Sequence, residues 1–242
     1  MRRNARKFRV NFHRRATFVP PGRIAISSKD VLLSFPDQEG VKWDFITIFL
    51  EDSYGLGSIG EGIATVLDIG GNVGFFAVAA RQYFPSAVIH SYEPNPQLLQ
   101  YISNQGVQCA FSVFGEAVGG HRGNVSMQFP DGSDFNLGRT SEGGEGMIPQ
   151  IALDEAVARL GGKVDLLKLD CEGAEWEMLK EAQCWSSIER LTMEYHLFGG
   201  QTHEELRKTL VSIGFSVLKH RFAQECHYGH VCAVNRDLLH GA

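Results

Sequence analysis

The sequence lacks the features of a membrane-spanning protein, a secreted protein or a protein with a structural zinc site. It contains no run of roughly 18 apolar residues, so we expect no segment to cross a membrane. Its five cysteines are widely spaced and include no Cys-x-x-Cys pair, which argues against a disulfide framework and against a zinc site. The N-terminus has no apolar signal-peptide core. Together these absences predict a cytoplasmic protein.

Acidic residues are missing from the first 29 positions, which hold nine of the 23 Lys and Arg residues although the chain carries a net charge of −5. This basic segment has three interpretations: a solvated arm, an arm that contacts an anionic substrate or nucleic acid, or an element that packs on the acidic body. We favour the first and the third, because basic arms alone prove little. With 43% hydrophobic residues the chain can build a full core. We therefore predict a basic N-terminal extension over residues 1–29 and a single domain over residues 30–242.

Two nucleotide-binding fingerprints are also missing around the segment Thr65–Gly74, which reads TVLDIGGNVG. Its short apolar run, two glycines and the apolar segment that resumes at Phe75 predict a strand, a tight turn and a helix. The glycines do not have the spacing of a dinucleotide site, and no Gly-Lys-Ser/Thr of a phosphate-binding loop follows. Because open α/β sheets bind ligands at the carboxyl ends of their strands, this turn marks the expected floor of a site.

Acidic residues narrow the choice of ligand. Asp68 lies in the turn itself, and Glu93 follows the next apolar run, Ala87–Tyr92. Ionised carboxylates only accept hydrogen bonds, so they suit ribose hydroxyls and a cation but repel a pyrophosphate. S-adenosylmethionine meets both demands. The alternative is an ordinary βα turn without such a ligand.

The order of strand-like and helical segments predicts the fold class. Their alternation favours an α/β fold with a doubly wound, mostly parallel sheet. Phe215–Leu218 and His230–Val234 are expected to form a closing antiparallel pair. Before the central strand, Val31–Phe35 and Trp43–Leu50 are rich in β-branched and aromatic residues and flank a turn-rich stretch. They predict an N-terminal β extension in the form of a hairpin.

Polar residues stand at the carboxyl ends of three further predicted strands. They are Glu116 with its neighbour Ala117, Asp170, and the pair Glu194 and His196. In a doubly wound sheet, Glu116 and the backbone of Ala117 could face an adenine ring. The other three could come within reach of one oxygen atom of an acceptor.

The sequence resembles the FkbM-type family of S-adenosylmethionine-dependent methyltransferases. The resemblance covers roughly residues 52–195, with a weaker match toward the C-terminus, and leaves out the basic first 29 residues. Its segments are VLDIGGNVGFFAVAA (66–80), YEPNP (92–96), EAVG (116–119), LDE (153–155), DLLKLDCEGAE (165–175) and MEYH (193–196). DLLKLDCEGAE is the most specific of them.

This resemblance implies a class I methyltransferase fold, with seven strands of which one is antiparallel. It implies that the turn residues hold the methionine part of the cofactor, that Glu93 binds the ribose hydroxyls and that Asp170 lies beside the amine or sulfonium. The cofactor-binding residues expected on this basis are Asp68, Gly70, Asn72, Gly74, Glu93, Asn95, Glu116, Ala117 and Asp170.

The chemistry of methyl transfer indicates where catalysis should occur. Transfer from a sulfonium is an in-line displacement, so the protein mainly aligns acceptor and methyl group, and a hydroxyl acceptor must also lose a proton. We expect Asp170, Glu194 and His196 to be catalytic, with His196 as the base by its ordinary pKa. His196 could instead be a core residue, or the three residues could bind a hard divalent ion. We predict no metal, because the spacing does not require one. Charge at a helix N-terminus explains Glu172 and Glu175 without catalysis.

The acceptor is narrowed by two further absences. No NPPY-like segment for amino-group methylation is present, and Cys171 lacks the Pro-Cys setting of a nucleic-acid C5 nucleophile. We therefore expect O-methylation of a hydroxyl on a small molecule, glycan or natural product. The alternatives are an RNA or protein methyltransferase that docks through the basic arm, and a catalytically silent adenosine-binding scaffold.

Overall fold

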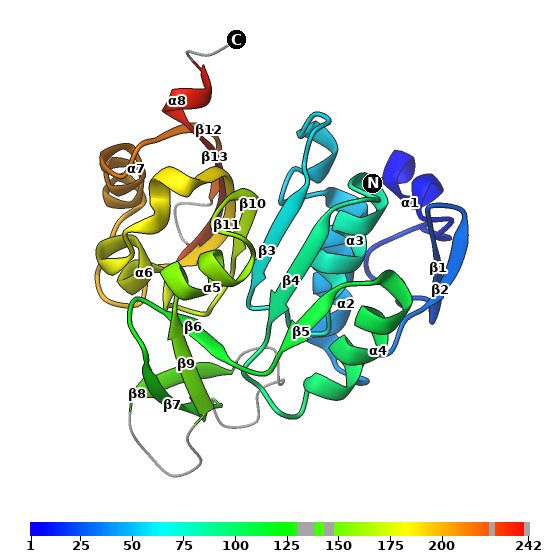
Figure 1. Cartoon of the computed structure of the whole chain (residues 1–242). Helices are drawn as coiled ribbons and strands as arrows, with labels where there is room; N and C mark the ends of the chain where they lie inside the picture. Colours follow the sequence, from blue (N-terminus) through cyan, green and yellow to red (C-terminus); the bar gives the residue numbers. More distant parts are fainter. Residues whose placement is uncertain (130–137, 143–147, 223–225, 240–242) are drawn as a thin grey trace.

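A seven-stranded sheet forms the centre of the computed structural model, which describes residues 1–129, 138–142, 148–222 and 226–239 (Figure 1). Its strands lie in the order β12-β13-β11-β10-β3-β4-β5. In that order they span Phe215–Phe222, Tyr228–Asn235, Ile188–His196, Val164–Leu169, Thr65–Ile69, Val88–Tyr92 and Ser112–Phe114. Every neighbouring pair is parallel except the two that involve β13. The predicted doubly wound α/β fold with one antiparallel strand is confirmed.

Helices cover both faces of this sheet (Figure 1). The helices α3 and α4 pack on one face and α5, α6 and α7 on the other. In that order they span Phe75–Tyr83, Leu99–Cys109, Leu153–Arg159, Glu175–Glu181 and His203–Ser212. Successive side chains of a strand point to opposite faces, so Val66 and Leu166 enter the first core while Leu67 and Leu167 enter the second. All four are completely buried, as expected of central parallel strands.

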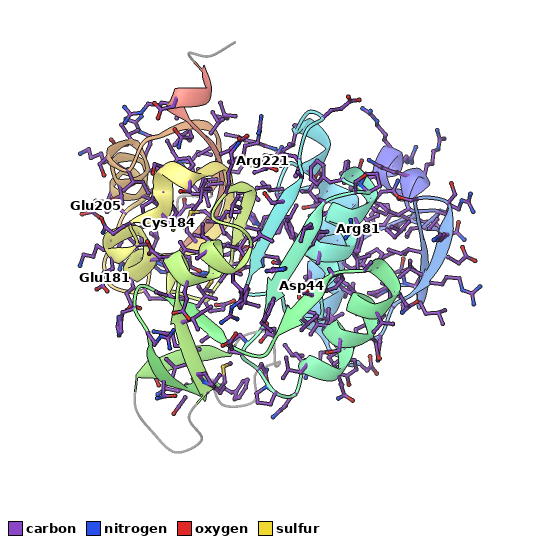
Figure 2. All side chains as sticks on the ribbon, viewed as in Figure 1. Asp44, Arg81, Glu181, Cys184, Glu205 and Arg221 are labelled. Atoms are coloured by element: carbon purple, nitrogen blue, oxygen red, sulfur yellow. The ribbon has the colours of Figure 1, made fainter. Side chains whose placement is uncertain are left out.

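Arg81, which Figure 2 labels, lies near the end of α3 and links this helix to α4 and to the segment before β4. Its guanidinium donates hydrogen bonds to the carbonyl oxygens of Cys109 and Ala87, each at 2.8 Å. These bonds satisfy carbonyl groups at the end of α4 and before β4.

A second, four-stranded sheet follows β5, in the order β6-β9-β7-β8. Its strands span, in chain order, Ala117–Gly119 (β6), Gly123–Gln128 (β7), Arg139–Glu142 (β8) and Ile148–Ala152 (β9). A short 3₁₀ helix at Cys184–Ser187 and the helix α8 at Arg236–Leu239 belong to the C-terminal half.

The predicted N-terminal hairpin is wrong in its partner. β2 (Lys29–Leu32) pairs with β1 (Arg23–Ile26), whereas the predicted second strand lies in the helix α2 (Glu39–Phe45) and the π-helix that follows it, Ile46–Glu51. The buried residues of this stretch are Val41, Phe45, Ile46, Phe49 and Leu50. Their spacing of four and five residues is that of one helix face, and it overrides the local preference of β-branched residues for strands.

The basic first 29 residues pack against the rest of the chain. After α1 (Arg2–Lys7), Phe8 is 1% exposed and its ring meets that of Phe49 at 5.0 Å between centroids. Phe18 is also buried in the same core cluster. Asn4 donates a hydrogen bond to the carbonyl oxygen of Leu50 at 3.1 Å. Of the three interpretations of this segment, the structure supports packing on the body; the boundary at residue 29 stays a prediction.

Two features of the structure bear on the predicted cytoplasmic location: the lengths of its helices and the state of its cysteines. Within the described ranges, no helix is long and apolar enough to cross a membrane, and the five cysteines are all free. The cytoplasmic location stays a prediction.

Candidate active site

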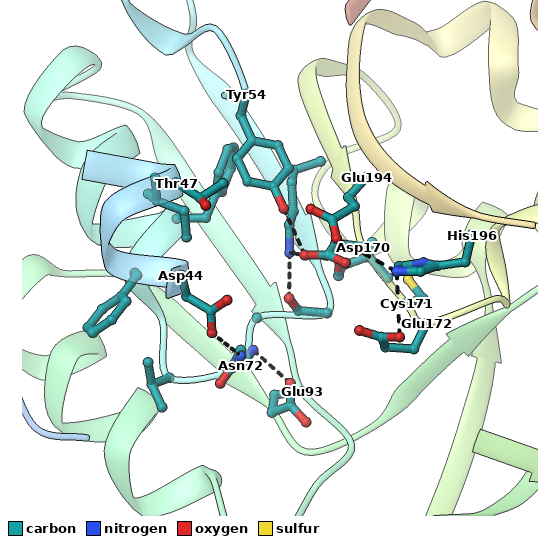
Figure 3. Close-up of a pocket in the computed structure, with 18 of the residues that line it drawn as sticks. Asp44, Thr47, Tyr54, Asn72, Glu93, Asp170, Cys171, Glu172, Glu194 and His196 are labelled. Carbon is teal, nitrogen blue, oxygen red and sulfur yellow. Dashed lines mark hydrogen bonds and ion pairs between the residues drawn. The ribbon is translucent and has the colours of Figure 1, made fainter. Parts of the chain in front are cut away.

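A cavity of about 800 Å³ lies at the carboxyl ends of the central strands (Figure 3). Gly70 follows β3, Glu93 follows β4, Asp170 follows β10 and His196 ends β11, and all four line this cavity. The sequence separates these residues widely, but the strands that carry them are neighbours in the sheet. The opposite wall is formed by α2 and the π-helix, from which Asp44 reaches the cavity (Figure 3).

The glycine turn after β3 is shaped by its contacts with both neighbouring strands. The N–H groups of Gly70 and Gly71 both donate to the carbonyl oxygen of Tyr92, at 3.0 and 2.8 Å. Gly70 has a φ of +78°, and a Cβ at this position would lie 1.8 Å from the carbonyl oxygen of Asp170. Only glycine fits such a position, because it has neither the steric penalty at positive φ nor the Cβ that would clash.

Glu93 binds the turn from the end of β4. One of its carboxylate oxygens accepts the N–H of Asn72 at 2.7 Å, and the other accepts the N–H of Asn95 at 2.7 Å. The side chain is buried, and this burial raises the pKa of Glu93 to about 7, although the two backbone donors oppose the shift. Glu93 therefore changes its charge near neutral pH, with its position fixed.

Lys168 sits at the centre of a buried group of charges beneath the cavity. Its ammonium lies 3.3 Å from Asp68 and 3.6 Å from Asp170, and Asp68 also accepts the hydroxyl of Ser91 at 2.6 Å. Burial lowers the pKa of Lys168, but the two carboxylates outweigh it and leave the pKa above its ordinary value. The hydroxyl of Tyr54 donates to Oδ2 of Asp170 at 2.7 Å. These contacts fix the orientation of Asp170 at the cavity wall.

His196 lies among three carboxylates at the end of β11, and Figure 3 labels two of them, Glu172 and Glu194. Its Nε2 is 3.5 Å from Glu172 and 3.7 Å from Glu194, and its Nδ1 is 3.6 Å from Glu175. Burial lowers the pKa of His196, but Glu175 and Glu172 outweigh it and raise the pKa to about 9. Burial likewise raises the pKa of Glu172 to about 7. With only these protein groups around it, the imidazole of His196 is protonated and positively charged at neutral pH.

The predicted site residues fall into two groups. Those that line the cavity are Gly70, Asn72, Glu93, Glu116, Ala117, Asp170, Glu194 and His196. Asp68, Gly74 and Asn95 lie behind its surface and support it through Lys168, the start of α3 and Glu93 respectively. The prediction that Asp68 lies in the turn is wrong, because it is a buried residue of β3 held by Lys168 and Ser91. The cofactor and catalytic roles of both groups stay predictions.

Four side chains that line the cavity were not predicted as site residues from the sequence. Asp44 accepts a hydrogen bond from the amide of Asn72 at 3.0 Å, and burial together with Asp170 raises the pKa of Asp44 to about 8. The others are Tyr54, Lys168 and Glu172. For Lys168 a signal existed, since an ionisable residue in an otherwise apolar buried strand needs charged partners. For Asp44 and Tyr54 no local pattern points to the cavity.

Comparison with known proteins identifies the family of this fold. The model of the methyltransferase FkbM domain matches residues 68–218, more than half of the chain. No match occurs among curated protein sequences.

Three similar solved structures are also methyltransferases. Magnesium protoporphyrin IX methyltransferase from Synechocystis PCC 6803, solved with bound SAM, has 13% identity and a TM-score of 0.50 over 84% of this chain and 86% of that chain. Ribosomal protein L11 methylase from Lactobacillus delbrueckii subsp. bulgaricus has 10% identity and a TM-score of 0.48 over 84% and 81%. Precorrin-6y C5,15-methyltransferase from Geobacter metallireducens GS-15 has 11% identity and a TM-score of 0.47 over 84% and 93%.

The first of these structures is similar enough to show that the fold is shared, and the family match gives the chemistry. The chain belongs to the FkbM family of S-adenosylmethionine-dependent methyltransferases.

Proposed function

We propose that this protein transfers the methyl group of S-adenosylmethionine to a hydroxyl of a small molecule, glycan or natural product. The observation that carries this proposal is that one cavity holds both the glycine turn with Glu93 and the acid–imidazole group of Asp170, Glu194 and His196. The first would bind the cofactor and the second would receive the acceptor. Methyl donor and hydroxyl could then meet without leaving the cavity.

Cofactor binding would rest on hydrogen-bond acceptors of fixed geometry. Glu93 keeps lone pairs free beyond the two backbone donors, so in its ionised form it can accept the ribose hydroxyls. Asn72 and the glycine turn would face the methionine part, and Glu116 with Ala117 would lie beside the adenine. Asp170 would supply negative charge for the sulfonium and ammonium groups, and their approach would favour the ionised form of Asp44, whose pKa burial raises to about 8.

The transfer step needs a group that accepts the hydroxyl proton. The acceptor oxygen attacks the methyl carbon, the carbon–sulfur bond breaks, and the sulfonium becomes the neutral sulfur of S-adenosylhomocysteine. His196 is held as a cation among its carboxylates, which weakens its candidacy as the base. Glu194 is the alternative proton acceptor, because it is a carboxylate whose side chain lines the cavity.

Calorimetry on the purified protein tests the cofactor half of this proposal. We expect S-adenosylmethionine and S-adenosylhomocysteine to bind, and Glu93→Ala to weaken binding by roughly 1.5–3 kcal/mol, the size of hydrogen bonds to a charged group. Glu61→Ala, at an exposed position, serves as the control. If neither ligand produces binding heat, the proposal is contradicted. Methyl transfer is then tested by mass spectrometry of metabolites from cells with and without the gene.

One observation keeps the RNA or protein alternative open. Arg15, from the basic segment, lines the cavity and forms an ion pair with Glu51. If this segment docks a polyanion, affinity for the acceptor should fall steeply with salt while cofactor affinity hardly changes. A flat salt dependence would remove the nucleic-acid alternative. Cofactor binding without any methylated product would instead favour the silent scaffold.

A further inference from the structure

Three potential metal ligands converge on the acceptor side of the cavity. One carboxylate oxygen from Asp170, one from Glu172 and one imidazole nitrogen from His196 all lie within 4.8 Å of one another. They come from the end of β10, the loop after it and the end of β11, so the fold itself brings them together. We propose that Asp170, Glu172 and His196 bind a divalent first-row metal ion such as Mn²⁺.

The imidazole of His196 is fixed in the manner of a metal ligand. Glu175 is completely buried, and its carboxylate accepts the N–H groups of Cys171 at 2.7 Å and Gly173 at 2.9 Å. This immobile carboxylate faces Nδ1 of His196 at 3.6 Å and leaves Nε2 directed toward Glu172. A carboxylate behind one ring nitrogen, with the metal on the other, is the usual support of metal-binding histidines.

Among the residues that the structure describes, the buried Nδ1 of His196 has no hydrogen-bond partner. Its side chain is 9% exposed, and the carboxylate oxygens nearest to its two nitrogens lie 3.5–3.7 Å away. These separations exceed the roughly 2.7–3.2 Å of an ordinary N–H···O hydrogen bond. A buried imidazole whose nearest carboxylates lie beyond hydrogen-bond distance is the arrangement expected where a metal ion can bind between them.

The spacing also suits a metal ion. Bonds of about 2.1 Å place neighbouring octahedral ligands about 3.0 Å apart and opposite ligands about 4.2 Å apart. The distance of 3.5 Å between Nε2 of His196 and Glu172 lies between these values. Because the three ligand atoms lie within 4.8 Å of one another, coordination would need the side chains to close in around the ion.

The two carboxylates can each offer a free oxygen. In Asp170, Oδ2 accepts the hydroxyl of Tyr54 and faces Lys168, so Oδ1 remains. Glu172 has a φ of +52°, a conformation that residues other than glycine rarely adopt, and its side chain is 19% exposed toward the cavity. Three protein ligands leave coordination positions for water or an acceptor hydroxyl. Given the proposed function, a metal there would favour the deprotonated hydroxyl.

The ligand chemistry narrows the ion. Two carboxylates suit Mg²⁺, Ca²⁺ and Mn²⁺, while imidazole suits later transition metals, so a mixed set favours Mn²⁺ or a similar ion over Mg²⁺. A second cluster, His121 with Glu177 and Glu181, lies on the surface side of α6, where Figure 2 labels Glu181. There the imidazole already meets Glu177 at 2.7 Å in an exposed ion pair, which provides a built-in control.

Titration of the metal-free full chain with Mn²⁺, followed by the loss of the free-ion signal in electron paramagnetic resonance, tests the proposal. We expect one saturable site per chain and at least ~10-fold weaker binding in Glu172→Gln, since even outer-shell changes have that effect. Asp170→Asn should behave in the same way. Glu177→Gln, the matched change in the surface cluster, should leave the affinity unchanged.

Calorimetry with S-adenosylhomocysteine on the same proteins separates this proposal from the proposed function. Cofactor binding in Glu172→Gln and Glu177→Gln shows that both are folded and that the cofactor half of the site is intact, whereas Asp170→Asn, at a residue proposed to face the cofactor, is not used for this control. If S-adenosylhomocysteine binds but the parent takes up no Mn²⁺ at millimolar concentration, the metal site is wrong and the proposed function stands. Loss of Mn²⁺ binding in Glu177→Gln with full binding in Glu172→Gln would also overturn the proposal.

Discussion

The charge of Glu93 should control cofactor affinity across neutral pH. Burial raises the pKa of this carboxyl to about 7, whereas its ordinary value lies near 4.5. A protonated Glu93 can accept fewer hydrogen bonds and must place its own proton, so the ionised form is the one that suits ribose hydroxyls. Binding and ionisation are therefore linked, and cofactor affinity should rise with pH.

The size of the effect follows from this pKa. A group with a pKa of about 7 is ionised to about 9% at pH 6 and about 91% at pH 8, so affinity should rise ~10-fold, or ~1.4 kcal/mol. Near pH 7, binding should release about 0.5 proton per ligand. The stability of the ligand-free protein depends on pH in the opposite direction. Because the folded pKa is the raised one, the contribution of Glu93 is present below about pH 4.5 and is lost as pH rises through about 7.

Calorimetry with S-adenosylhomocysteine at three pH values, in buffers of different ionisation heat, measures affinity and proton release together. Glu93→Gln is the paired variant. At pH 8 its affinity should be lower than that of the parent, because one backbone N–H of Asn72 or Asn95 loses its acceptor. The pH dependence due to this residue should disappear. Asp44, whose pKa burial raises to about 8, titrates in both proteins, so their difference isolates Glu93. Equal pH dependence in the parent and the variant would refute the reasoning.

Three further predictions concern the turn, the N-terminal segment and the reaction centre. Gly70→Ala should abolish measurable cofactor binding, because its Cβ would meet a backbone carbonyl at 1.8 Å, whereas Gly22→Ala, with open space around it, should not. In urea unfolding, Phe8→Ala should cost about 3–5 kcal/mol, the usual loss for a buried Phe, and Val19→Ala, 79% exposed, almost nothing; equal losses would mean that the basic segment does not pack as described. Glu194→Gln should lower turnover by about 10²–10⁴ with cofactor affinity preserved, and a fully active variant would remove Glu194 as the proton acceptor.

The central site could be predicted from the sequence because parallel strands bring their carboxyl ends together. The apolar runs that end at the glycine turn and at Asp170 become β3 and β10, which pair from Leu166 with Val66 to Leu169 with Ile69. Once both are placed in a parallel sheet, the residues that follow them must be neighbours. The fold and the meeting of these two ends therefore needed no tertiary information beyond the strand order.

The opposite wall of the cavity could not be predicted in this way. Asp44 and Tyr54 reach the cavity only because α2 and the π-helix dock on α3, and that docking depends on side-chain packing between segments far apart in the chain. Local composition even favoured a strand there. Glu172 shows a second limit, since charge at a helix N-terminus explains its type, but its left-handed backbone directs it to the cavity instead.

Burial is the main cause of the raised pKa values of the cavity acids Asp44, Glu93 and Glu172, and the excess of acidic over basic residues adds to it. Among the described residues that line it, seven are acidic and three are Lys or Arg. Glu51 and Glu116 form ion pairs with arginines, and Asp170 with Lys168. Over the part of the chain that the structure describes, the other four acids have no Lys or Arg partner, although Glu172 and Glu194 face His196. Burial raises the pKa of Asp44, Glu93 and Glu172, so a bound cation would favour their ionised forms. A sulfonium cofactor would relieve this imbalance, and its loss of charge on methyl transfer would restore it. On the proposed function, the cavity therefore binds the charged substrate more favourably than the neutral product that must leave.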